Sequence, residues 1–126
     1  MDKLMRIGAF ARACNTSIST VRYYVQCGYL IPERQNGQYL FDERCRKDMD
    51  QITMWKSMLF SLEEIHELLS FQRRYTYPLR EDIEGYIAIY QRQLQRLFVH
   101  EKALNQRIDT VRAQLDNATG FYSIGQ

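Results

Sequence analysis

A segment near the N-terminus carries several hydrogen-bonding side chains at helical spacing. Ser17 is a suitable N-cap, and Gly28 suits the left-handed position after a helix end. Between them, Ile18, Val21 and Val25 recur as an apolar stripe that we expect to be buried. The other faces carry groups that hydrogen-bond to phosphates and base edges, namely Ser19, Thr20, Arg22 and Tyr23. The segment is therefore a candidate nucleic-acid recognition helix; the alternative is an ordinary amphipathic helix with a polar face.

A second short helix is expected directly before this one, over residues 6 to 14. Its apolar residues are Ile7, Phe10, Ala11 and Cys14. Asn15 tolerates a left-handed backbone, so it suits a tight turn into the next helix. Two short helices joined by such a turn form a helix-turn-helix, whose second helix enters the major groove of DNA.

The residues after the recognition helix predict a β-hairpin. Asn36-Gly37 is a strong signal for a two-residue hairpin turn. Alternation beyond the turn places Tyr39 and Phe41 on one face of the second strand. A hairpin in this position is a wing, and its residues placed to reach phosphates or a groove edge are Arg34, Asn36 and Gln38. The alternative for each of them is a solvated turn residue.

Two further helices are expected after the hairpin. Asp42 suits the N-cap of the first, which we expect to run to about Met58 and to be structural, because its charges balance. Ser61 and Glu64 have the spacing of a capping box and start the second helix. The segment from Tyr75 to Pro78 is expected to end it.

From Ile83 onward, the apolar residues follow alternating spacings of four and three. Such a 3.5-residue repeat predicts a coiled coil, because a helix on a globular surface follows 3.6. Nine of the ten repeat positions are apolar, and Glu101 is the exception. So long a helix needs a partner helix, and the simplest source is a second copy of the chain. The expected dimerisation residues are Ile83, Ile87, Tyr90, Leu94, Leu97, Leu104, Ile108, Val111 and Leu115.

The length of this 126-residue chain favours one compact domain plus one extended element. Residues 1 to 40 hold five basic and two acidic side chains, so the positive excess lies where a nucleic-acid contact needs it. The sequence has no apolar run of membrane-spanning length and no signal-peptide pattern. We therefore expect a cytoplasmic protein with no membrane partner.

The residue types do not favour a catalytic site, a cofactor or a metal site. Two isolated histidines, with no nucleophile motif and no glycine-rich phosphate loop, do not assemble an active site, so we expect no enzyme. The three cysteines, Cys14, Cys27 and Cys45, are widely spaced. We interpret them as small core or turn residues rather than as metal ligands or a disulfide framework.

The order of these elements and four motifs within them resemble the MerR family of bacterial transcription regulators. The motifs are Ile7-Gly-Ala-Phe-Ala11, Ser17 through Arg22-Tyr23-Tyr24, Gly28-Tyr-Leu-Ile-Pro32 and Phe60-Ser-Leu-Glu-Glu-Ile65. They cover about residues 5 to 70, and the architecture is similar to about residue 117.

Pattern and resemblance together indicate a mainly α protein with three parts. These are a winged helix-turn-helix DNA-binding domain over residues 1–76, a coiled-coil dimerisation helix over 78–117 and a short tail over 118–126. The resemblance implies an antiparallel homodimer that binds a pseudo-palindromic operator in double-stranded DNA, distorts it and meets RNA polymerase at the promoter. It also adds Ser17, Tyr24 and Tyr39 to the expected DNA contacts, although Tyr24 is equally suited to packing inward.

Four departures from the family pattern stand out. Ser19 stands where the family often has Arg, and Gln38-Tyr39 stands where it often has Tyr-Arg, so the expected base contacts differ. Val25 replaces a usual acidic residue and Leu59 replaces a usual Gly, which affects local packing.

The C-terminal end of the sequence carries a further expectation. The effector region of the family normally follows the long helix, whereas only about nine residues remain here, so we expect that the effector region is incomplete. Either the chain is truncated or it is a short regulator governed by a partner, and the sequence identifies no effector. Gly120 is expected to end the helix. Phe121, Tyr122 and Ile124 then form an apolar cluster that we expect to pack on the DNA-binding domain of the partner. The alternative is a disordered end.

Three functions remain open at this point. The first is a dimeric, sequence-specific DNA-binding transcription regulator. The second is an architectural or recombination-directing DNA-binding protein. The third is a protein-interaction module in which the coiled coil matters and the winged helix binds protein.

Overall fold

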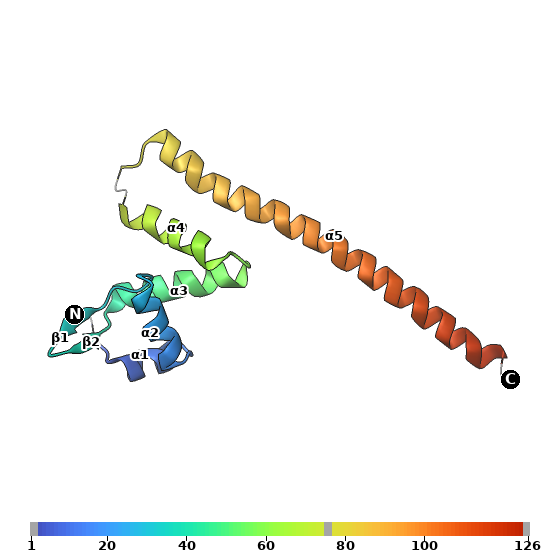
Figure 1. The fold of residues 1–126 in the computed structure, drawn as a ribbon, viewed down its shortest axis with the longest axis horizontal. Coiled ribbons are helices and arrows are strands. Elements are labelled where there is room, and N and C mark those ends of the chain that lie inside the picture. Colours follow the sequence, from blue (N-terminus) through green and yellow to red (C-terminus); the bar gives the residue numbers. More distant parts are fainter. Residues whose placement is uncertain (1–2, 75–76, 125–126) are drawn as a thin grey trace. The chain divides into compact units, whose positions relative to one another are not determined.

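A computed structural model describes residues 3–74 and 77–124 of the chain. Its elements are, in order, α1 (Ile7–Ala13), α2 (Ile18–Gln26), β1 (Glu33–Gln35), β2 (Gln38–Leu40), α3 (Glu43–Ser57), α4 (Leu62–Arg74) and α5 (Arg80–Ile124) (Figure 1). The chain divides into two units, residues 1–82 and residues 83–126. The fold is therefore mainly helical, with one small hairpin.

The helix-turn-helix forms where the sequence predicts it. Asn15 has a φ of 56°, which is the left-handed conformation expected for the turn between α1 and α2. Ser17 caps α2, because its Oγ accepts a hydrogen bond from the backbone N–H of Thr20 at 3.1 Å. Gly28 has a φ of 80° directly after the C-cap residue Cys27. Local signals thus set both ends of the recognition helix.

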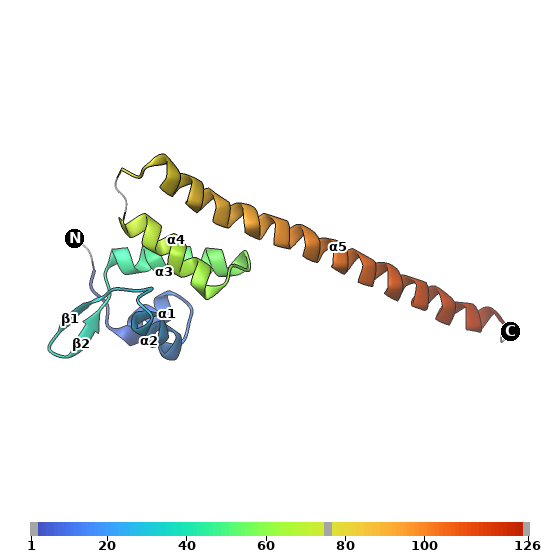
Figure 2. The same ribbon diagram turned by 45° about the horizontal axis from the view of Figure 1, so that its top comes forward.

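The wing is a two-stranded antiparallel sheet joined by a two-residue turn. Asn36 and Gly37 have φ values of 51° and 76°, and positive φ at both turn positions is the hairpin geometry that matches strand twist. The register pairs Glu33 with Leu40, Arg34 with Tyr39 and Gln35 with Gln38. Beyond β2, Met5 and Phe41 pair through two backbone hydrogen bonds, so the residues before α1 are joined to the wing. The hairpin reaches away from the helices in Figure 2.

Helices α3 and α4 lie side by side in both views and supply six of the ten largest fully buried side chains of the first unit (Figures 1 and 2). Asp42 caps α3 by accepting from the N–H of Cys45 at 3.0 Å. The predicted capping box of α4 is confirmed: the N–H of Glu64 donates to Ser61 Oγ at 3.2 Å, and the N–H of Ser61 donates to Glu64 Oε1 at 3.1 Å. The largest fully buried side chains are Phe10, Val21, Leu30, Phe41, Cys45, Ile52, Trp55, Ile65, Leu68 and Leu69.

One expected helix end is wrong. Gly120 does not terminate the long helix, because α5 continues to Ile124. Glycine costs about 1 kcal/mol in a helix interior, which a long helix tolerates at one position, and Gly120 does not take the positive φ of a terminating glycine. Residues 118–124 are therefore helical, and within them Phe121 is 73% exposed.

The expected apolar stripe of the recognition helix is corrected at one residue. Val21 is fully buried and Val25 is half-buried, but Ile18 is 42% exposed. Ile18 is the first residue of α2, where a side chain lies at the edge of the helix pair; a Cβ added at Gly8 in α1 would lie 3.9 Å from its Cδ1. Position in the first turn, rather than periodicity, decides its exposure.

Candidate nucleic-acid interface

The outward face of α2 presents the residues that the sequence singled out. Ser19, Arg22 and Tyr23 are exposed. The hydroxyls of Ser17 and Thr20 lie 2.8 Å apart and form a hydrogen bond with each other at the N-terminus of the helix. These two residues therefore hold the first turn of α2.

Tyr23 and Tyr24 differ in environment although they are neighbours. Tyr23 is 47% exposed, and its hydrogen bond with Cys27 raises the pKa of its hydroxyl, which stays neutral and able to donate. Tyr24 is only 3% exposed, and its hydroxyl accepts a hydrogen bond from Lys56 Nζ in α3 at 3.1 Å. Of the two placements considered for Tyr24, the inward one is observed, because the ring joins α2 to α3.

The wing residues divide between the tip and the base of the hairpin. Arg34, Asn36 and Gln38 are exposed. Tyr39 is half-buried, and the guanidinium of Arg34 on the paired strand lies 5.5 Å from its ring centroid. Tyr39 also meets the ring of Phe41 edge-on at 6.4 Å, which confirms that these two share a face.

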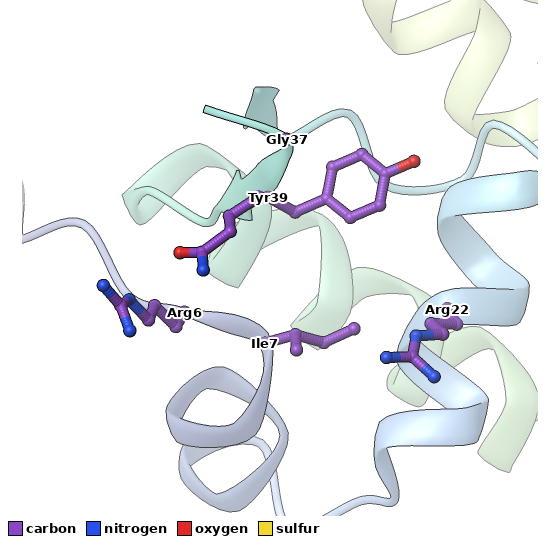
Figure 3. Close-up of a pocket in the computed structure, with 6 residues that line it drawn as sticks. Arg6, Ile7, Arg22, Gly37 and Tyr39 are labelled. Carbon is purple, nitrogen blue, oxygen red and sulfur yellow. The ribbon is translucent and has the colours of Figure 1, made fainter. Parts of the chain in front are cut away.

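Recognition helix and wing meet across a cleft of about 390 Å³ (Figure 3). The cleft is lined by Arg6, Ile7, Arg22, Gly37, Gln38 and Tyr39. Figure 3 shows Arg6 and Arg22 at opposite ends of it, with Ile7 between them and the Tyr39 ring above. Three predicted residues, Arg22 of α2 and Gln38 and Tyr39 of β2, are thus brought to one cavity.

Arg6 is the charged residue of this cleft that was not among the DNA contacts expected from the sequence. The available signal was its contribution to the positive excess of residues 1 to 40, together with its position just before the first helix. Among residues 3–74 and 77–124, the side chains of Arg6 and Arg22 form no hydrogen bond or ion pair. Two unneutralised guanidinium groups beside apolar and aromatic surface suit a sugar-phosphate backbone.

The expected dimerisation residues all lie along α5. Seven of them are between 42% and 68% exposed: Ile83, Ile87, Leu94, Leu104, Ile108, Val111 and Leu115. Tyr90 and Leu97 are half-buried. An apolar row of this length on one helix is unusual for a surface that faces water.

The described residues lack both a metal-ligand cluster and a membrane-spanning helix. Over the described ranges 3–74 and 77–124, the structure has no cluster of three or more acidic, His or Cys side chains that could hold a metal ion. Within the same ranges, the helices lack the combination of length and apolar character that crossing a membrane requires.

Comparison with solved structures shows the same fold in several regulators. HiNmlR, described as a MerR family regulator lacking the sensor domain and bound to promoter DNA, is 17% identical with a TM-score of 0.70, over 98% of this chain and 97% of that chain. A MerR family regulator from Bacillus cereus is 21% identical with a TM-score of 0.66, over 91% and 79% of the two chains. PbrR691 from Ralstonia metallidurans CH34, in complex with lead(II), is 22% identical with a TM-score of 0.64, over 86% and 85%.

Comparison by sequence identifies the family. No curated protein sequence matches the chain. The family model described as MerR HTH family regulatory protein matches residues 5–72, which is more than half of the chain. That range contains the helix-turn-helix, the wing and nearly all of the two helices after it. The chain belongs to the MerR family of helix-turn-helix regulatory proteins.

Proposed function

We propose that this protein is a homodimeric transcription regulator that binds a pseudo-palindromic operator in promoter DNA and distorts it. The observation that carries the proposal is the cleft between recognition helix and wing, where Arg6 and Arg22 lie without carboxylate partners among the described residues. Such a cleft binds a DNA strand through its phosphates, while Ser19 and Tyr23 on the same helix face the groove.

The contacts fall into two classes by chemistry. Arg6, Arg22 and Arg34 supply charge for phosphates, which makes binding strong and dependent on salt. Ser19, Gln38 and Asn36 offer neutral donors and acceptors, which read base edges or groove width. Tyr24 is excluded from both classes, since its side chain is buried.

The homodimer is supported by the 4-3 repeat of α5. The repeat positions from Ile83 to Leu115 are mostly exposed, and burying them against a second copy removes apolar surface from water. Because α5 extends to Ile124, the same spacing also reaches Ala118 and Tyr122, beyond the last predicted position. An antiparallel pair of such helices, each about 68 Å long, gives a two-fold dimer.

Two-fold symmetry implies a two-fold related site on DNA. Two identical winged helices read two half-sites, so the operator is a near-palindrome. On the basis of family membership, we further propose that the protein distorts the DNA and meets RNA polymerase at the promoter. HiNmlR is described as a regulator lacking the sensor domain and bound to promoter DNA, so a chain of this architecture is compatible with promoter binding.

The decisive experiment is a map of bound sites in the cell of origin, combined with selection of duplexes from a random pool by the purified protein. We expect a near-palindromic consensus that lies within promoters. Sites with a consensus but outside promoters would instead support an architectural or recombination-directing role. Failure to enrich any duplex would contradict DNA recognition altogether.

A further inference from the structure

The segment that follows the recognition helix is held by a side chain from α4. Arg73 donates from Nη1 to the carbonyl of Gly28 at 2.8 Å and from Nη2 to the carbonyl of Tyr29 at 2.6 Å. Helix α2 has no basic residue in its own last turn, so no cation of its own compensates the carbonyl groups at its end. Arg73, which lies 45 positions after Gly28 in the chain, places a cation just beyond that helix end, on two carbonyls of the loop that follows it.

The same segment is attached to α4 a second time. The Tyr29 hydroxyl donates to the carbonyl of Leu62 at 3.2 Å, and the Tyr29 ring lies 5.8 Å from that of His66. Burial raises the pKa of Tyr29, so its hydroxyl stays protonated and remains a donor. Leu62 begins α4 and Arg73 lies in its last turn, so the two attachments are about 16 Å apart along the helix.

Asp48 of α3 completes the arrangement. Its Oδ2 accepts from Arg73 Nη2 at 2.9 Å, and the two side chains are only 20% and 30% exposed. One guanidinium thus joins three elements: the loop after α2, helix α3 and helix α4. Bonds of this kind are charge-assisted and have a fixed planar geometry that an ammonium group does not reproduce.

We propose that Arg73 is a positioning residue for DNA recognition, which sets the angle between the recognition helix and the wing. The wing begins at Glu33, only four residues after Tyr29, so the point that Arg73 holds is the hinge between the two DNA-binding elements. A change at this hinge alters the cleft between Arg22 and Tyr39 without removing any residue that lines it. The expected effect on DNA recognition rests on the proposed function, whereas the role of Arg73 in holding the loop after α2 does not.

The structural part is tested by amide hydrogen exchange on Arg73→Lys, which keeps the charge but loses the planar fork. The N–H groups of Tyr29 and Leu30 both donate to the Tyr24 carbonyl, at 2.8 and 3.2 Å. We expect these amides to exchange about tenfold faster, while the amides of β1 and β2 keep their rates. Arg46→Lys is the matched control, because Arg46 forms an exposed ion pair with Asp50 on α3. Unchanged exchange at Tyr29 and Leu30 in Arg73→Lys would overturn the proposal.

The consequence for recognition is tested with two duplexes: one that the wild-type protein selects from a random pool, and one of scrambled sequence. We expect Arg73→Lys to weaken binding to the selected duplex about tenfold, with no change for the scrambled duplex and no change in the salt slope. Asp48→Asn is expected to act in the same direction, since Asp48 orients the guanidinium.

Two other results would contradict the positioning role. A salt slope reduced by about one unit, with equal losses for both duplexes, would show that Arg73 contacts a phosphate directly. A fall in the urea midpoint large enough to account for the loss of binding would show a purely structural role. If the wild-type protein selects no duplex, the proposed function fails, and hydrogen exchange alone decides whether Arg73 holds the hinge.

Discussion

The ring of Phe10 in α1 lies flat against the ring of Phe41, with centroids 4.5 Å apart and planes inclined by 12°. Both side chains are 1% exposed. Because Phe41 directly follows β2, this stacked pair joins the first helix of the helix-turn-helix to the base of the wing. The separation between the two DNA-binding elements therefore depends on aromatic packing beneath them as well as on the Arg73 contacts.

Phe41→Leu removes the stacked ring and leaves a smaller apolar side chain. We expect the free energy of unfolding to fall by about 1–2 kcal/mol, because an aromatic contact and part of the buried area are lost. Urea unfolding of the full chain measures this. Tyr77→Leu is the control, since Tyr77 is 92% exposed and its replacement is expected to change little. A loss no greater than that of the control would contradict the role of the pair.

Leu59 lies between α3 and α4 with a φ of 64°, a left-handed conformation that a leucine adopts only at a cost. Its side chain is 63% exposed, so little packing is lost on its removal. Leu59→Gly is expected to stabilise the protein by about 1 kcal/mol, measured as a rise in the urea midpoint. Leu59→Ala removes the same packing but keeps a Cβ, so it separates backbone strain from side-chain loss. Equal effects of the two variants would refute strain at this position.

Asp42 makes stability depend on acid pH. The hydrogen bond from the Cys45 N–H holds the pKa of the Asp42 carboxyl below its ordinary value of 3.8. A lowered folded pKa means that the cap contributes its full stability above the unfolded pKa and loses it as pH falls through the folded pKa. Asp42→Asn still accepts the capping bond but does not titrate. We therefore expect its thermal unfolding midpoint to fall less than that of the wild-type protein between pH 5 and pH 3, measured for both proteins over a pH series. Identical pH profiles would exclude Asp42 as a contributor.

Arg22→Ala is expected to weaken binding to a selected duplex and to lower the salt slope by about one unit, because one phosphate contact is removed. Arg6→Ala is expected to have the same signature, since both residues line the cleft. Arg46→Ala provides a charge-matched control on α3. Retention of full affinity and slope in either cleft variant would remove that residue from the interface.

Dimerisation is tested by placing two charges in the apolar repeat of α5. The double variant Leu94→Asp and Leu97→Asp is expected to sediment as a monomer, because two carboxylates would be buried between the helices. Gln95→Asp with Val99→Asp adds the same charge to the same helix off the repeat; Val99 is 69% exposed. This control is expected to remain dimeric. Monomeric behaviour of both variants, or of the wild-type chain, would contradict the repeat as the interface.

Much of the first unit could be predicted from the sequence, because the signals are local. Ser17 with Thr20, Asp42 with Cys45, and Ser61 with Glu64 each satisfy a helix N-terminus within three residues. The Asn36-Gly37 turn likewise needs only the backbone freedom of two residues. Capping hydrogen bonds and turn conformations between near neighbours do not depend on which other elements pack against them. The expected helices and hairpin follow from these local interactions.

The sequence by itself determined which elements form and where most of them begin and end, since caps and turns act between near neighbours. Only the tertiary structure decided which side chains of those elements contact one another. It turned Tyr24 inward to Lys56, brought Arg6 beside the wing and placed Arg73 on the carbonyls of Gly28 and Tyr29. These contacts join residues up to 45 positions apart. They depend on how separate helices pack, which neither periodicity nor capping specifies.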